Sequence, residues 1–513
     1  MSGAGTVDVM FGAFRRPRSV RIDMAQCTTA PDGSDLAAAA GPLAGAVLVG
    51  GAVRDQLLGR PLTDLDWLVR DPHERAEALA LRLTGSVVAL DPERGHWRVV
   101  ATGRRWDLVA PEGAAGAHRP DPLDPAVLER DLRRRDLTIN AMAVLPDGRV
   151  VDPTGGRADL TAGVVRLASE RALADDPLRA WRAVRIAAQL GFRLDEASAQ
   201  AIHALADELR STSRPLPAIE RIAAELSACL ASDAAGKAFA ALDGLGLLES
   251  VLPELTAGRG VAQGGLHHLD VLQHQLEALQ RLVDAFPAAD AALRWATVLH
   301  DVGKPLTFEH EEGDRPRFHG HDAVGAEVTK RALSRLRLPQ ALAARAAALV
   351  AAHMRPLPTG EKAARRFVHR LRPLLPDLLR LMVADREAAR GPLASATGRR
   401  RYRLALAEVI RRLEDEPTPS APLLDGFEVM RRLGLPAGPT VGTALAAVAE
   451  ARAVGEVATP DEAEAYLRSM AAAQGWPVAA AAQIEDAPAE DAPAERAPAE
   501  RAPLEDDATT DGR

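Results

Sequence analysis

The chain has 513 residues and a formal net charge of −8 at pH 7, which excludes a single hydrophobic core and argues against binding of nucleic acid by overall positive charge. Apolar residues make up 47% of the chain and aromatic residues only 3%, a composition that favours helices packed on helices. Cys27 and Cys229 fit no metal-binding or redox spacing, which indicates a reducing, cytoplasmic setting.

The N-terminal residues show no pattern typical of a helix or a strand. Residues 1–45 lack periodicity and are rich in Gly, Ser and Ala, so we expect a flexible extension. The uncharged run 36–53 is long enough to span a membrane, but it is rich in Ala and Gly and contains Pro42. We therefore predict a helix, a turn and a strand there, and no membrane segment.

The remaining chain divides into one strand-rich and three helical regions. Between residues 46 and 160, short β-type runs such as AVLVGG, SVVAL and WRVVA alternate with helical or turn segments, which predicts a small mixed sheet with helices on it. Helical patterning follows at 161–260, 261–390 and 391–477, beginning with a helix that Gly191 should end. The predicted fold class is α+β. Residues 478–513 repeat a unit of Ala, Pro and charge, which predicts a disordered tail.

Two aspartates stand one residue apart in the predicted strand TDLDW. Asp64 and Asp66 should point to the same face, because side chains alternate along a strand. Such carboxylates repel each other unless a divalent cation such as Mg²⁺ binds both, as in sites of phosphoryl transfer. Gly50 and Gly51 let backbone N–H groups approach phosphate, and Arg54 opens the following helix. The combination predicts a nucleotide site, whereas either motif alone would suit a surface strand or a tight turn.

Other charged residues of this region are candidates for the same site. Asp107 in RRWDLVA is a candidate third carboxylate, although an exposed strand residue would explain it equally well. In DLRRRDLTINAMAV, Arg135 can pair with phosphate or ribose, while Asp136 and Asn140 can brace it or meet a 2′-hydroxyl. A solvated basic turn is the alternative interpretation of this segment.

Several segments carry a family resemblance. VGGAVRDQLLG, TDLDW, DLRRRDLTINAMAV, VVDPTGG and DDPLRAWRAVRIAAQLGF resemble, in order, signature motifs of the bacterial tRNA nucleotidyltransferase and poly(A) polymerase superfamily. The resemblance implies a nucleotidyltransferase head at 46–160, followed by a helical neck with an RNA-binding role at 161–260, then body and tail. It also implies that Asp64 and Asp66 bind metal, and it implies nucleotide contacts by Gly51, Arg54 and Arg135.

Four charged residues should form a stripe on the predicted helix DDPLRAWRAVR, because they recur every three positions: Asp176, Arg179, Arg182 and Arg185. A carboxylate beside a guanidinium matches the hydrogen-bonding edges of cytosine and adenine, whereas guanine and uracil would turn a carbonyl oxygen toward the carboxylate. The resemblance assigns the first two residues to the base and gives the other two nucleotide contacts. A solvated helix face is the alternative. PAIERIAAELSACL resembles the family's neck segment, in which Arg221 would be structural.

A second cluster of His and Asp lies in the helical half, in HHLDVLQHQL, LHDVGKP, FHGHDAVG, AAHMRP and VADREA. It resembles the HD phosphohydrolase superfamily, and this resemblance implies an HD domain at 261–390 with four metal ligands: His274, His300, Asp301 and Asp385. Lys304 lies near enough to meet phosphate, and His321 and His353 could bind a second metal or substrate. Mixed N/O ligation suits Mn²⁺, Ni²⁺, Zn²⁺ or Mg²⁺, so the identity of this divalent metal stays open. A vestigial, inactive domain is the alternative.

Together these observations predict a cytoplasmic, template-independent nucleotidyltransferase that adds CCA to tRNA 3′ ends from CTP and ATP, with Mg²⁺ in the head and a phosphohydrolase activity in the HD domain. Poly(A) polymerase, or an enzyme that adds only CC or only A, is a near alternative because these enzymes share nearly all motifs. A different-class alternative is an HD phosphohydrolase whose head merely binds RNA. The intact carboxylates and the arginine stripe disfavour it. No oligomeric state is predicted.

Overall fold

The computed structural model describes residues 39–62, 64–111, 120–264, 268–309, 316–391, 395–415 and 421–476. The chain divides into two compact units, one made of residues 1–356 and 373–403 and the other of residues 357–372 and 404–513. Most of the expected N-terminal extension and all of the expected tail at 478–513 lie outside the described residues.

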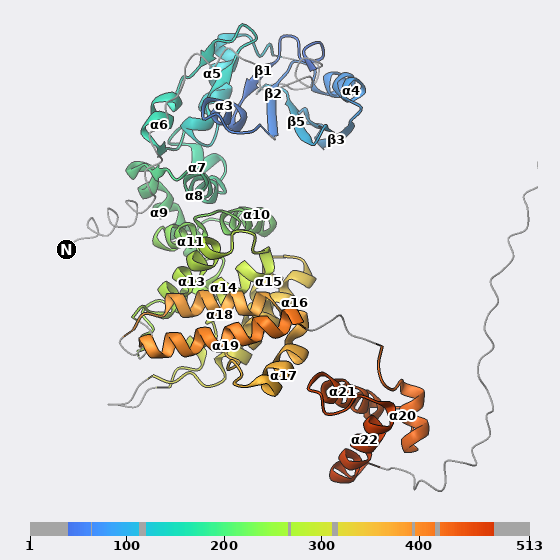
Figure 1. The fold of residues 1–513 in the computed structure, drawn as a ribbon. Coiled ribbons are helices and arrows are strands. Elements are labelled where there is room, and N and C mark those ends of the chain that lie inside the picture. The colour runs from blue at the N-terminus through green and yellow to red at the C-terminus, as the bar shows by residue number, and fades with distance from the viewer. Residues whose placement is uncertain are drawn as a thin grey trace, which may run out of the picture. The chain divides into compact units, whose positions relative to one another are not determined.

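The first unit begins with a seven-stranded mixed sheet (Figure 1). Its strand order is β3–β4–β5–β2–β1–β6–β7, and every neighbouring pair is antiparallel except β2 and β5. This arrangement confirms the predicted mixed sheet. The strands are β1 (Val47–Val49), β2 (Asp64–Leu68), β3 (Ser86–Asp91), β4 (His96–Ala101), β5 (Arg104–Val109), β6 (Ala143–Val144) and β7 (Val150–Val151).

The two faces of this sheet differ in chemistry. One face carries apolar side chains such as Leu65 and Trp106, which are fully buried, and helix α4 (Pro72–Leu83) packs against it through Leu79 and its neighbours. The ring of His73 on α4 lies 4.0 Å from the ring of Trp97 on β4, between centroids. Because side chains alternate, the opposite face receives the carboxylates of β2. Four further short helices complete the head: α3 (Gly51–Leu57), α5 (Pro125–Arg133), η2 (Thr138–Asn140) and α6 (Gly156–Ala162).

A helical neck follows the head and contains one short parallel strand pair, β8 (Val164–Val165) with β9 (Arg193–Leu194). Helix α8 (Arg179–Leu190) ends at Gly191, whose φ of 67° is left-handed, as the glycine signal predicts. Trp181 and Val184 of α8 are buried. The other helices here are α7 (Ala172–Asp175), α9 (Glu196–Arg210), α10 (Ile219–Leu230), α11 (Ala235–Gly244) and α12 (Pro253–Thr256).

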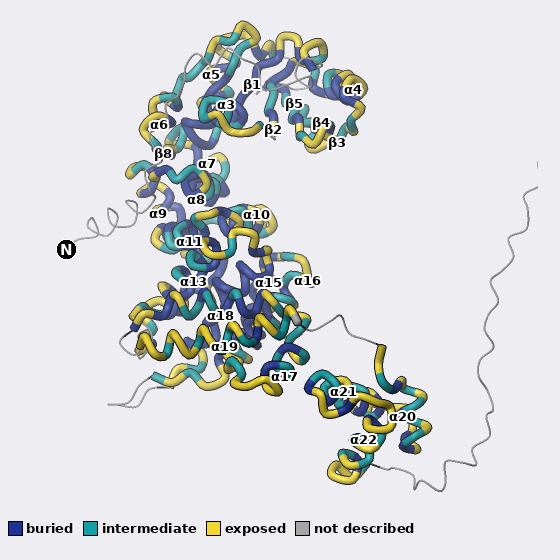
Figure 2. The backbone as a smooth tube through the Cα atoms, in the orientation of Figure 1, coloured by how far each residue is buried: buried dark blue, intermediate teal, exposed yellow. Residues whose placement is uncertain are grey.

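The helical bundle that completes the first unit packs closely, and its buried residues concentrate where the helices meet (Figure 2). The buried side chain of Arg294 donates hydrogen bonds to the carbonyl oxygens of Leu230 and Ser232, and these bonds tie the bundle to the end of α10. The bundle comprises α13 (Val271–Ala285), α14 (Ala291–Leu299), η3 (Lys304–Leu306), α15 (His321–Arg335), α16 (Gln340–Ala352) and α18 (Asp377–Ala388).

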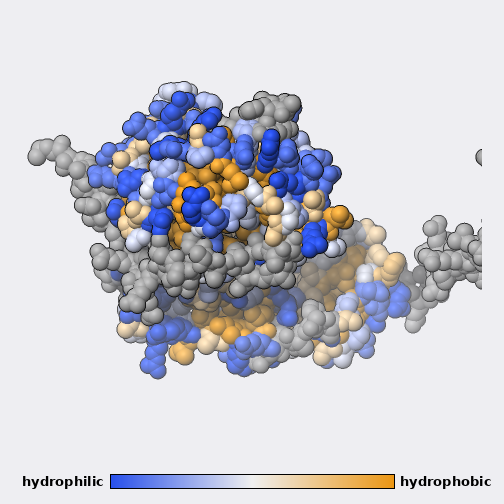
Figure 3. All heavy atoms as spheres, turned by 90° about the horizontal axis from the view of Figure 1, so that it is seen from above, coloured by the Kyte–Doolittle hydropathy of each residue, from blue (hydrophilic) through white to orange (hydrophobic). Residues whose placement is uncertain are grey.

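The second unit is helical, with a core that includes Val429, Val441, Val448 and Leu467. Its helices are α17 (Glu361–Leu371), α20 (Gly426–Leu433), α21 (Pro439–Ala453) and α22 (Pro460–Gln474). Boundaries between the two units fall within η4 (Arg372–Leu374) and α19 (Ala396–Asp415). Among the described residues no helix combines the length and apolar character needed to cross a membrane. Figure 3 shows hydrophilic residues over much of the molecule seen from above, with apolar residues between them.

Candidate active sites

The first site is built on β2 and β5. β2 places Asp64 and Asp66 on the sheet face opposite α4, and β5, which runs parallel to β2, sets Asp107 directly opposite Asp66. Asp64 accepts hydrogen bonds from Arg105 at 2.5 and 2.8 Å, and Asp107 accepts them from Arg98 at 2.6 and 2.7 Å. Three carboxylates therefore meet on one face, two of them already paired with arginine.

The pKa values of Asp66 and Asp107 are shifted in opposite directions. Burial raises the pKa of Asp66; Arg135 opposes this rise, and the neighbouring carboxylates of Asp107 and Asp64 add to it. Burial would also raise the pKa of Asp107, but hydrogen bonds from Arg98 and a neighbouring histidine lower it to about 2. Carboxylate oxygens are the ligands that Mg²⁺ prefers. Asp64 and Asp66 therefore fit a magnesium site. Asp107 is a weaker candidate because its ion pair with Arg98 is mostly buried, whereas the pair of Asp64 with Arg105 is about half exposed and solvent weakens it.

The turn between β1 and α3 brings the backbone close to these carboxylates. Gly50 has a φ of 77° and ψ of −143°, a conformation that side-chain-bearing residues rarely adopt. A Cβ at this position would lie 2.9 Å from both Oδ2 of Asp66 and Nη1 of Arg135. Gly51 begins α3 directly afterwards. Only glycine therefore allows this close approach of backbone, carboxylate and guanidinium.

A chain of hydrogen bonds links α3 to the segment after α5. Nη1 of Arg54 donates to Oδ1 of Asn140 at 2.7 Å, and Nδ2 of Asn140 donates to Oδ1 of Asp136 at 3.1 Å. Burial would raise the pKa of Asp136, but the charge of Arg182 and the bond from Asn140 lower it. Asp136 and Asn140 thus brace Arg54 instead of Arg135, the residue that the sequence led us to expect.

The same series of hydrogen bonds continues into the neck, where it includes Glu225 of α10. The sequence analysis did not identify Glu225. Arg182 of α8 donates to Asp136 at 3.3 Å and to Glu225 at 3.4 Å, and Nε of Arg185 donates to Glu225 at 2.5 Å. Glu225 is only 7% exposed. It lies on the buried face of α10 with Ile222 and Leu226, and a carboxylate at a core-facing helical position was the available signal.

Asp176 does not lie on the same helix as the arginines, and this part of the prediction is wrong. Asp176 follows α7 in an extended conformation (φ −150°, ψ 106°), and α8 begins only at Arg179. Pro177 explains the break, because a proline disfavours helical geometry at the preceding residue. Asp176 accepts a hydrogen bond from Nη2 of Arg221 at 2.7 Å, while Arg179 donates to the carbonyl oxygens of Ala172 and Arg135, at 3.2 and 3.4 Å.

Despite that break, the head and neck residues line one cleft of about 410 Å³. Its walls include the glycine turn, the β2 carboxylates and the charged residues of the neck: Gly50, Gly51, Arg54, Asp64, Asp66, Arg135, Asp136, Asn140, Asp176, Arg179, Arg182 and Arg185. Asp107 is absent from this lining. The cleft is therefore strongly polar, and it brings together all of the other residues predicted for the nucleotide site.

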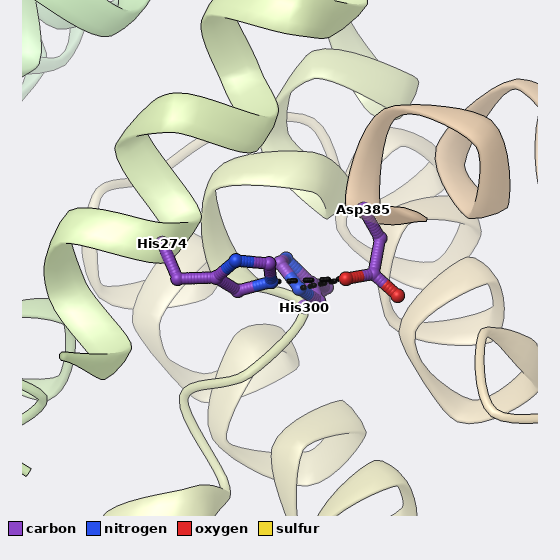
Figure 4. A group of neighbouring side chains, drawn as sticks. All are labelled: His274, His300 and Asp385. Atoms are coloured by element: carbon purple, nitrogen blue, oxygen red, sulfur yellow. Dashed lines mark hydrogen bonds and ion pairs between the residues drawn. The ribbon is translucent and has the colours of Figure 1, made fainter. Parts of the chain in front are cut away.

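The second site is buried in the helical bundle. His274 of α13, His300 at the end of α14 and Asp385 of α18 converge (Figure 4), with ligand atoms within 4.8 Å of one another. Nε2 of His274 lies 2.9 Å from Oδ1 of Asp385, and Nε2 of His300 lies 3.7 Å from the same oxygen. Both histidines are 0% exposed. The three side chains come from three helices and meet at one point, as a metal site requires.

A second group of potential ligands adjoins the first. Asp301, His321 and His353 also converge within 4.8 Å, and Nε2 of His321 and of His353 lie 3.4 and 3.6 Å from Oδ1 of Asp301. Asp301 also approaches the first group, because its Oδ2 lies 3.2 Å from Nε2 of His300. The Nδ1 atoms of these three histidines lie 2.6–2.8 Å from backbone carbonyl oxygens. These contacts fix Nδ1 as the protonated nitrogen and leave Nε2 as a ligand atom.

The charged groups of this site lie close enough together to shift one another's pKa values. Burial would lower the pKa of His300, but the charges of Asp301 and Asp385 raise it to about 10, so a divalent metal that binds Nε2 would displace the proton from that atom. Lys304 donates at 2.6 Å to both Asp301 and Gln263, so its ammonium group lies beside the cluster. Among the described residues, Oδ1 of Asp301 and Nε2 of His300, His321 and His353 are buried without a hydrogen bond. Buried, unsatisfied ligand atoms of N and O type fit a site for divalent metal.

Comparisons with known proteins agree with a head that carries the first site and a helical bundle that carries the second. Family models match three segments in chain order: "Poly A polymerase head domain" at residues 46–166, "Probable RNA and SrmB- binding site of polymerase A" at 191–258, and "HD domain" at 268–390. The chain is 52% identical over 428 residues to the A-adding tRNA nucleotidyltransferase of Deinococcus radiodurans, which covers 83% of this chain and 96% of that protein. It belongs to the tRNA nucleotidyltransferase family.

Other members of the tRNA nucleotidyltransferase family are also similar. The CC-adding tRNA nucleotidyltransferase of Thermus thermophilus is 43% identical over 424 residues, which cover 82% of this chain and 92% of that protein. Among solved structures, the CCA-adding enzyme of Bacillus stearothermophilus in complex with CTP matches with a TM-score of 0.57 at 23% identity, covering 86% of this chain and 99% of that one. This structural likeness shows that the fold is shared.

Proposed function

We propose that this tRNA nucleotidyltransferase adds nucleotides to the 3′ end of tRNA without a nucleic-acid template. The observation that carries the proposal is the single cleft of about 410 Å³ in which the β2 carboxylates of the head face the arginines and Asp176 of the neck. A binding module would need the arginines but not paired carboxylates on a strand beside them. The cleft therefore supports phosphoryl transfer better than simple RNA binding.

In this reaction the terminal 3′-hydroxyl of the tRNA attacks the α-phosphate of a nucleoside triphosphate, and pyrophosphate leaves. Asp64 and Asp66 would hold Mg²⁺, which when bound supplies activation of the attacking hydroxyl and neutralises charge on the phosphates. Arg135 and Arg182 bind the triphosphate through guanidinium groups already aligned by ion pairs. Glu225 keeps Arg182 and Arg185 together at the cleft, so it acts as a positioning residue.

Base selection falls to Asp176 and Arg179 at the neck side of the cleft. A carboxylate has about four acceptor positions, so Asp176 can keep its bond from Arg221 and still accept from the exocyclic amino group of adenine or cytosine. Arg179 presents further donors to the ring acceptors of the base. Arg221 is then a positioning residue for Asp176, which goes beyond the structural role that the sequence suggested.

For nucleotide specificity, we propose addition of the terminal A. The A-adding relative is similar over nearly its whole length and is more similar than the CC-adding one, at 52% against 43% identity. Addition of the full CCA, favoured by the sequence analysis, is a second candidate because the Asp176–Arg179 pair matches the hydrogen-bonding edges of both cytosine and adenine.

Three tRNA transcripts separate these specificities, each lacking one more nucleotide of the 3′ CCA, with ATP and CTP supplied singly and together. Addition of A alone, and only to the transcript ending in CC, supports the A-adding assignment. Extension of every transcript to CCA would replace it with the second candidate. Absence of any extension, with intact protein and Mg²⁺, would overturn the proposed nucleotidyltransferase function.

A second activity is favoured by the set of potential metal ligands in the helical bundle, all of them buried except the partly exposed Asp385. We propose that His274, His300, Asp301 and Asp385, together with His321 and His353, hold divalent metal for hydrolysis of phosphoesters. Lys304, beside Asp301, is placed to meet the phosphate. Elemental analysis of the purified chain tests the site directly, because His300→Ala with Asp301→Ala should lose the bound metal. Equal metal content in both proteins would contradict the assignment.

A further inference from the structure

A second groove adjoins the nucleotide cleft and carries an excess of positive charge. Its volume is about 770 Å³. The charged residues of its lining are five arginines against two aspartates, and we call it the arginine groove: Arg94, Arg134, Arg179, Arg214 and Arg221, with Asp175 and Asp176. This excess stands out in a chain whose net charge is −8. A polyanion would be drawn to it.

A third hollow beside the cleft serves as a comparison, because it is larger but electrostatically balanced. This mixed-charge groove, of about 1080 Å³, is lined by four cationic and four acidic residues: Arg54, Arg60, Arg185 and Lys237, with Asp55, Asp64, Asp233 and Asp284. Its size alone would make it a candidate path for RNA. Its charge balance gives it no preference for phosphate, so electrostatics favours the arginine groove.

One wall of the arginine groove is apolar and stiff. Pro215, Leu216 and Pro217 line it in succession, in the link between α9 and α10. Leu216 is 40% exposed, and the flanking prolines restrict the backbone on either side of it. A groove that combines an apolar wall with cationic side chains suits single-stranded RNA, because unpaired bases offer flat apolar surfaces and phosphates are attracted to positive charge.

The arginine groove meets the nucleotide cleft at the two residues assigned to the base. Asp176 and Arg179 line both hollows. A strand lying in the groove would therefore end beside the incoming nucleotide.

Arg94 is available for such a contact. Its side chain is 87% exposed, and its ion pair with Asp91, at 3.7 Å, is weak in this solvated position.

We propose that the arginine groove binds the single-stranded 3′ end of the tRNA acceptor arm, with its phosphates on the arginines and its bases against the Pro215–Pro217 wall. This assignment rests on the proposed nucleotidyltransferase function and adds to it the path by which the RNA reaches the cleft. Bases of that strand would then stand next to the nucleotide being selected, so the RNA end itself forms part of the selecting site.

Equilibrium binding of a labelled acceptor minihelix ending in CC tests this path without requiring catalysis. The full-length double variant Arg94→Ala with Arg134→Ala is compared with wild type between 50 and 200 mM KCl. The logarithm of the affinity falls linearly with the logarithm of the salt concentration, and each lost phosphate contact should make this slope shallower by about 0.7 for a single strand. We expect the slope to become shallower by roughly 1.4. The Kd for ATP, measured without RNA, should not change, because neither arginine lines the nucleotide cleft.

The matched control removes two positive charges from the mixed-charge groove, by Arg60→Ala with Lys237→Ala. This variant should bind the minihelix with the wild-type slope. A minihelix without the single-stranded end distinguishes the strand from the duplex stem, because the effect of the arginine variant should disappear with it.

Equal slopes for wild type and the arginine variant would overturn the proposal, as would an effect confined to the duplex stem or a larger effect of the control variant. Groove-dependent binding without nucleotide addition would instead leave the groove assignment standing and refute the nucleotidyltransferase function.

Discussion

Replacement of Gly50 by alanine tests whether the β1–α3 turn sets the geometry of the nucleotide site. The new Cβ would lie 2.9 Å from Oδ2 of Asp66 and from Nη1 of Arg135, whereas ordinary contacts begin at 3.4 Å. Each group must therefore retreat by about half an ångström. Since a displacement of ~1 Å can lower an enzymatic rate by about 100-fold, we expect nucleotide addition to fall roughly tenfold.

The same substitution also strains the backbone. A side-chain-bearing residue at the Gly50 conformation costs about 1–3 kcal/mol, and each kcal/mol lowers Tm by roughly 2–4 °C in a domain of about 150–250 residues. Gly59→Ala provides the control, because Gly59 also has a positive φ, of 63°, but a Cβ there would meet nothing within 4 Å. It should lower Tm without lowering the rate.

The assay measures single-turnover addition of ATP to CC-ended tRNA, alongside thermal unfolding of each variant. A loss of activity in Gly50→Ala but not in Gly59→Ala would assign the defect to crowding of Asp66 and Arg135. Equal activity losses in both variants would refute this reasoning, because strain alone would then explain the effect. Full activity in Gly50→Ala would show that the close approach is not needed.

The remaining predictions concern the carboxylates and the second site. The raised pKa of Asp66 means that its ionised form destabilises the fold at neutral pH, so Asp66→Asn should raise Tm in EDTA at pH 7.5, with a gain that shrinks as the carboxyl of the wild type becomes protonated at lower pH; a lower Tm would contradict the sign. His300→Ala with Asp301→Ala should abolish metal-dependent phosphoester hydrolysis and spare nucleotide addition, and joint loss in a folded protein would argue against separate centres. Asp176→Ala should reduce selectivity for ATP over GTP by roughly ten- to a hundred-fold, since a hydrogen bond to a charged group contributes about 1.5–3 kcal/mol; unchanged selectivity would remove Asp176 from base selection.

Features that depend on local pattern were predictable from the sequence. Alternation along TDLDW was enough to put Asp64 and Asp66 on one face, and Gly191 marked the end of α8. Asp176 shows how one local signal was overlooked, because Pro177 already indicated that the helix could not run through the preceding residue. The break moves Asp176 off α8 and toward Arg221.

Contacts between distant segments were not predictable in the same way. Glu225 reaches Arg185 across 40 residues, and Lys304 reaches Gln263 across 41. Such pairs depend on the packing of α8 against α10 and on the approach of η3 to the segment between α12 and α13. No spacing in the sequence encodes this packing. The pairing of Asp107 with Arg98 likewise follows from the register of β4 against β5. The residue types therefore indicated where the sites are, whereas the hydrogen-bond partners of each side chain depend on tertiary packing.

Whether Asp64 and Asp66 carry nucleotide addition is tested by the incorporation of labelled ATP into CC-ended tRNA. Wild type, Asp64→Ala and Asp66→Ala are compared in the presence of Mg²⁺. Circular dichroism should confirm that all three proteins are folded. We expect incorporation by the wild type alone, with both variants at background because the metal loses a carboxylate ligand. Incorporation at the wild-type rate by either variant would contradict this expectation.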